Sequence, residues 1–124
     1  MDQKFKTFDE FCKHYGISSD LPVITGVNEQ QKKQLIATYI WEKIVETLNN
    51  EGLEEPWIPD YSNPKQEKWE LWIRYSPSSG WSLDDVGNWL TRTVTHCGAR
   101  RVFRTKQIGK YAGENLLHFF TDTF

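Results

Sequence analysis

The chain has 124 residues, the usual size of a single domain, and its 38% hydrophobic and 15% aromatic content excludes an intrinsically disordered chain. The net charge of −2 predicts no general affinity for nucleic acid or membranes, and no apolar run has the length of a membrane span. We therefore expect one domain over residues 1–124. Met1 to Glu10 alternates charge with Phe where a signal peptide needs an apolar core, which predicts a cytoplasmic protein.

The first predicted element is a short helix that begins after Thr7. Thr7 and Glu10 have the spacing of a capping box, and Gly16 is a typical residue after a helix end. Apolar residues recur between them at intervals of three or four: Phe8, Phe11, Cys12 and Tyr15. The segment 17–27 mixes Ser, Asp, Pro and Gly without a period, so we expect it to be a loop.

The second predicted helix is the most strongly patterned element. Asn28 is a favourable N-cap, Gln31 stands at the capping-box position, and residues 49–52 supply a stop. One face is apolar at helical spacing: Ile36, Ala37, Ile40, Trp41, Ile44 and Leu48. The segment 54–66 carries three prolines and predicts an irregular connection.

Strict alternation over residues 68–75 predicts a strand. One face would hold Trp69, Leu71, Ile73 and Tyr75 against the core, and the other would hold Lys68, Glu70, Trp72 and Arg74 mostly in water. We expect the apolar face of the second helix, with Trp41 at its centre, to pack on this strand.

Two more strands are predicted, near residues 89–95 and 100–104, with turn residues at 76–80 and Gly98. Thr105 would cap a last helix with an apolar stripe that runs from Ile108 to Phe120. The predicted fold is α+β, with two N-terminal helices and a C-terminal helix packed on a short three-stranded antiparallel sheet.

The residue types that usually carry catalysis do not form a recognisable site. Cys12 and Cys97 form no CxxC pair, and their spacing from the histidines is not that of a zinc site. His96 and Cys97 are neighbours, so on a strand they would point to opposite faces. Asp84 and Asp85 are typical of a surface turn. We predict no catalytic residue, no metal and no cofactor. We expect both cysteines to be reduced, and a buried thiol is more typical of such a cysteine than a reactive one.

A basic segment is the strongest functional signal. Residues 1–88 hold nine Lys or Arg against fifteen Asp or Glu, whereas residues 89–110 hold six bases and no acid. Cationic side chains beside exposed aromatic rings are typical of a contact surface for single-stranded nucleic acid. The candidate binding residues are Arg100, Arg104, Lys106, Trp72, Trp81 and Trp89. The alternative is that these bases form only the solvated side of a sheet.

About two thirds of the chain resembles a known group of proteins, most clearly near the C-terminus. That part runs Cys97-Gly-Ala-Arg-Arg-Val-Phe-Arg-Thr-Lys106 and then Lys110-Tyr-Ala-Gly-Glu-Asn-Leu116. With Asn49 and the Trp57-Ile-Pro-Asp60 segment, this ending is similar to that of a family of uncharacterised small proteins of phages, prophages and mobile elements in Bacteroides-type gut bacteria. The resemblance implies a biological setting and supplies no catalytic signature.

Together these patterns predict a small non-enzymatic binding protein with a protein partner, and the resemblance implies an accessory role in a phage or mobile element. One alternative is a single-stranded nucleic-acid-binding module that uses residues 89–110. The other is an enzyme of a class that the sequence does not reveal.

Overall fold

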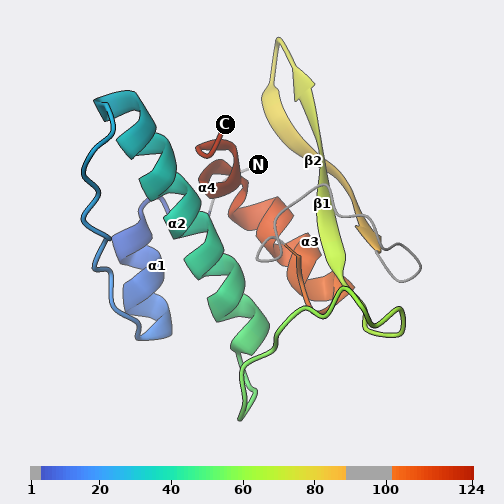
Figure 1. The fold of residues 1–124 in the computed structure, drawn as a ribbon. Helices are drawn as coiled ribbons and strands as arrows, with labels where there is room; N and C mark the ends of the chain where they lie inside the picture. Colours follow the sequence, from blue (N-terminus) through green and yellow to red (C-terminus); the bar gives the residue numbers. More distant parts are fainter. Residues whose placement is uncertain (1–3, 89–101) are drawn as a thin grey trace.

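The structure, a computed structural model, describes residues 4–88 and 102–124 and has an α+β fold. Its elements are α1 (Phe8–Tyr15), α2 (Glu29–Asn50), β1 (Trp69–Ser76), β2 (Gly80–Asn88), α3 (Lys106–Asn115) and α4 (Leu117–Thr121). Figure 1 shows α1 and α2 on one side, the β1–β2 hairpin on the other, and α3 between them. α3 packs against both strands, and α4 packs against α2.

The helices begin where the local patterns predict. The side chains of Thr7, Asn28 and Thr105 each accept a hydrogen bond from the backbone N–H three residues later. At Asn28 the box is complete, because Gln31 also accepts from the Asn28 backbone N–H. The predicted last helix is divided into α3 and α4 at Leu116, which is fully buried.

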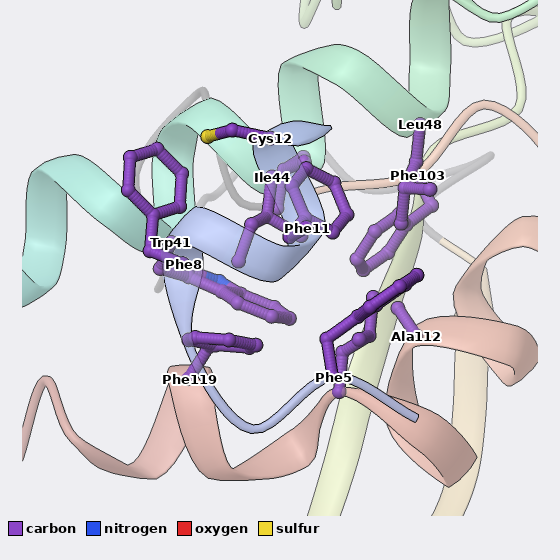
Figure 2. Close-up of a cluster of buried hydrophobic side chains, with 12 residues drawn as sticks. Phe5, Phe8, Phe11, Cys12, Trp41, Ile44, Leu48, Phe103, Ala112 and Phe119 are labelled. Atoms are coloured by element: carbon purple, nitrogen blue, oxygen red, sulfur yellow. The ribbon is translucent and has the colours of Figure 1, made fainter. Parts of the chain in front are cut away.

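The core lies between the helices and the base of the hairpin. It combines Phe5 and residues of α1 with the second half of α2, Phe103 and residues of α3 and α4, as Figure 2 shows. Trp41 is only 1% exposed, as its position in the apolar stripe of α2 predicts. Its ring stacks on Phe120 and meets Phe103 edge-on, so α2 packs mainly on the C-terminal segment rather than on β1 as expected.

The described part of the sheet has two strands, which corrects the predicted three. β1 pairs with β2 in antiparallel order, and Asp84 is the extra residue of a bulge, because Trp72 pairs with Asp85 and Ile73 with Leu83. Of the strand predicted near residues 100–104, Phe103 forms a single antiparallel bridge with Trp69. The strand predicted at residues 89–95 lies outside the described residues.

The alternation predicts that Lys68 lies on the solvated face of the strand. The structure corrects this, because Lys68 is only 1% exposed. Its ammonium group donates to the backbone carbonyls of Asp60, Asn63 and Gln66 at 2.9–3.0 Å. The proline-containing segment therefore folds over the start of β1 and is held there by this one buried cation.

The contact between α3 and the hairpin depends on small residues. A Cβ atom added to Gly113 would lie 2.7 Å from a methyl carbon of Leu83, closer than van der Waals contact allows. Gly109 faces Phe103 and Val86 at ordinary contact distance. The glycines that weaken the predicted helix thus let it approach the sheet closely.

Candidate functional site

The hairpin places aromatic side chains on both faces. Gly80, with a φ of 76°, ends the turn between the strands in a left-handed conformation that glycine adopts without strain. Figure 1 shows that the hairpin reaches beyond α3 and α4. Residues near its tip are therefore ordered by strand pairing yet remain accessible.

On the inner face, Tyr75 pairs directly with Trp81 across the two strands. Their ring centroids are 5.1 Å apart in an edge-on arrangement, which favours the pair energetically. Tyr75 belongs to the strand face predicted to be buried, but it is 58% exposed because it lies beyond the helices. Trp81 is 42% exposed.

The C-terminal residue extends this cluster. The ring of Phe124 meets Trp81 at 5.0 Å between centroids, and Phe120 meets Phe124 at 5.3 Å. Phe120 in turn stacks on the buried Trp41. Tyr75, Trp81 and Phe124, which we call the aromatic surface, are thus exposed rings in a continuous chain of contacts that ends in the core.

Trp72 lies on the opposite face of the hairpin from Trp81. It is three residues from Tyr75 along β1, and side chains alternate between faces. Its indole covers Gly87, where an added Cβ would collide with the ring, and its Nε1 donates to Glu70 at 3.0 Å. The same face carries an exposed ion pair between Arg74 and Asp84.

Arg104 faces the end of α2. Its Nε donates to the carbonyl of Asn49 at 2.9 Å and its Nη2 to that of Glu51 at 3.4 Å. Carbonyls at a helix C-terminus have no partner within the helix, so Arg104 satisfies groups that would otherwise need water. This guanidinium has a structural role.

Lys106 is placed at the base of the hairpin. Its Nζ lies 5.9 Å from the ring centroid of Trp69, a cation–π distance. Trp89 and Arg100 lie outside the described residues. The six predicted binding residues therefore divide: Arg104 contacts α2, Lys106 contacts Trp69, and Trp72 and Trp81 occupy opposite faces.

Two residues of the aromatic surface, Tyr75 and Phe124, were not among the predicted site residues. Tyr75 continues the alternation of the buried face. It is exposed because the helices that cover this face do not extend as far along the strand as Tyr75. Phe124 lies outside the apolar stripe predicted from Ile108 to Phe120, and its contact with Trp81 is tertiary.

One surface hollow, of about 500 Å³, is lined by a histidine and two carboxylates, His14, Glu46 and Glu51, together with Tyr15 and neighbouring residues. The His14 ring packs against Phe5 and Tyr15. Burial raises the pKa of the Tyr15 phenol above its ordinary range. The hollow is thus lined by a phenol with a raised pKa and by a histidine that packs against two aromatic rings.

Among residues 4–88 and 102–124, no cluster of three or more His, Cys, Asp or Glu is arranged to hold a metal. The same ranges contain no helix that is long and apolar enough to cross a membrane. Comparisons with family models, curated proteins and solved structures find no match for the chain.

Cys12 is a free thiol that behaves as a core residue. It is 1% exposed, and its Sγ lies 3.6 Å from the carbonyl of Ser18. Burial, with a smaller contribution from Asp9, raises the pKa of this thiol, so little reactive thiolate is present at neutral pH. The structure agrees with the expected buried thiol at this position.

We expect iodoacetamide at pH 8 to leave Cys12 unmodified in the folded protein and to alkylate it fully in guanidinium. Peptide mass spectrometry resolves the Cys12 peptide from other cysteines. Rapid labelling of Cys12 under native conditions would contradict its burial.

Proposed function

We propose that the chain is a small non-enzymatic binding protein that contacts a protein partner through the aromatic surface. The observation that carries the proposal is the exposed cluster of Tyr75, Trp81 and Phe124, whose rings support one another. The resemblance of about two thirds of the chain supports an accessory role in a phage or mobile element, and the charged N-terminal sequence supports a role in the cytoplasm.

Several properties of the aromatic surface suit protein recognition. Tyr and Trp are enriched among the residues that dominate binding energy at interfaces, because they bury large areas with few rotatable bonds. Strand pairing fixes Tyr75 and Trp81, and Phe120 connects Phe124 to the core. Little side-chain entropy is therefore lost when a partner covers these rings.

The single-stranded nucleic-acid alternative has less support from the described residues. It needs free cations beside exposed rings, but Arg104 donates to the end of α2 and Lys106 lies over the half-buried Trp69. The nucleic-acid alternative would therefore need cations from the rest of the basic segment, residues 89–110.

The proposal is tested with immobilised protein as bait in lysate from the cells that produce it, in parallel with and without nuclease. We expect Trp81→Ser to reduce the recovered partner by about tenfold or more, as loss of an aromatic anchor does. Trp72→Ser is the matched control, because Trp72 is at least as exposed as Trp81 but lies on the other face. It should retain the partner.

Equal recovery with Trp81→Ser and the original chain would overturn the assignment of this surface. Loss of the partner on nuclease treatment, together with salt-sensitive binding of a fluorescent single-stranded oligonucleotide, would favour the nucleic-acid alternative.

A further inference from the structure

A second surface lies at the C-terminal end of α2. A groove of about 420 Å³ runs between the last turns of this helix and the segment 56–59. Val45 and Val102 contribute apolar atoms to it, and Trp57 and Ile58 line its side. Its volume falls in the range of about 300–1,000 Å³ found for ligand-binding clefts.

Hydrogen bonds to backbone groups of residues 57 and 58 hold the wall of the groove in place. The Trp57 N–H donates to the side chain of Asn50 at 2.8 Å, and the carbonyl of Ile58 accepts from Gln66 at 2.9 Å. Prolines on both sides restrict the backbone further. The Ile58 side chain is nevertheless 72% exposed, so a fixed backbone presents a large apolar group to solvent.

The charged residues that line the groove, Glu42 and Glu46, are both acidic. Glu46 lines it and is exposed, and residues 51–60 carry Glu51, Glu54, Glu55 and Asp60 with no Lys or Arg. Leu53, within this acidic stretch, is 41% exposed. An apolar groove with a negative rim complements an apolar segment with positive flanks.

We propose that this acidic groove binds a basic amphipathic segment of a protein partner. Apolar side chains of that segment would cover Ile58 and Trp57, and its Lys or Arg residues would face Glu46 and the acidic stretch. Amphipathic helices are recognised in this way, by apolar anchors at helical spacing with charges beside them. The acidic groove is built from other residues than the aromatic surface and does not depend on it.

The probe for the test is a 14-residue peptide of Leu and Lys in amphipathic helical order, titrated into the ¹⁵N-labelled full chain. We expect amide shifts to change at residues 45–58 and not in the hairpin. Ile58→Ser should weaken binding at least tenfold, and Glu46→Gln with Glu55→Gln should reduce the salt dependence of the dissociation constant. These side chains are exposed, so the variants should fold.

Matched controls separate specific from general attraction. Val23→Ser removes a side chain that is 92% exposed in the loop 17–28, and Trp81→Ser removes part of the aromatic surface; both should bind like the original chain. A Leu–Glu peptide of the same pattern should not bind. The proposal is overturned if Ile58→Ser binds unchanged, if Val23→Ser loses as much affinity, or if the shifts map elsewhere.

Discussion

Trp41→Ala is expected to lower the free energy of unfolding by about 3–5 kcal/mol, the range for a large aromatic side chain removed from a core. Trp41 is 1% exposed and joins α2 to Phe103 and to Phe120. No other single side chain of α2 contacts both of these rings through an aromatic pair in the described structure. Truncation would therefore leave a cavity where three segments meet.

Urea unfolding followed by circular dichroism measures this loss. Ile58→Ala, at an exposed apolar position, is the control and should change stability by less than about 0.5 kcal/mol. Trp41→Phe should cost much less than Trp41→Ala, because the buried Nε1 of Trp41 has no hydrogen-bond partner among the described residues. A loss below 1 kcal/mol for Trp41→Ala, on the scale of surface changes, would show that this residue is not central to the core.

Lys68→Met should lower the free energy of unfolding by about 2–4 kcal/mol, because it keeps most of the aliphatic side chain but removes the ammonium group. Three backbone carbonyls would lose a charged donor, and the segment 60–66 would lose the contact that holds it over β1. Because the cost falls on this segment, amide hydrogen exchange should accelerate there more than in α2.

Lys65→Met is the matched control, since Lys65 is exposed and contacts the same turn through its backbone N–H, which donates to the Asn63 side chain. It should be nearly neutral. Equal stability losses in the two variants would indicate that removing any cation here acts through net charge, and would contradict a specific role for the Lys68 ammonium.

Local sequence signals predicted the N-terminal ends of α1, α2 and α3 well. Thr7, Asn28 and Thr105 cap the helices that they were expected to cap, because a cap depends only on residues three or four positions away. β2 was missed for a related reason. The extra residue Asp84 shifts the alternation, so Trp81, Leu83 and Val86 do not follow a simple period of two.

The candidate site was harder to predict because it depends on tertiary geometry. Trp72 and Trp81 were both candidates for a stacking surface beside the basic side chains, but the register of the hairpin places them on opposite faces. The sequence suggested that Arg104 was a free cation. Only the fold shows that its guanidinium donates to carbonyls at the end of α2. Lys68 followed a polar pattern, yet the preceding segment covers it.

The side chain of Asn49 satisfies the backbone groups along one edge of the short segment 102–104. Phe103 exchanges both backbone hydrogen bonds with Trp69, which leaves the carbonyl of Val102 and the N–H of Arg104 pointing the other way. The amide of Asn49, 3% exposed, donates to that carbonyl at 2.9 Å and accepts from that N–H at 2.8 Å. A side chain thus replaces the next strand, and this apolar segment offers no open edge there on which another chain could begin to aggregate.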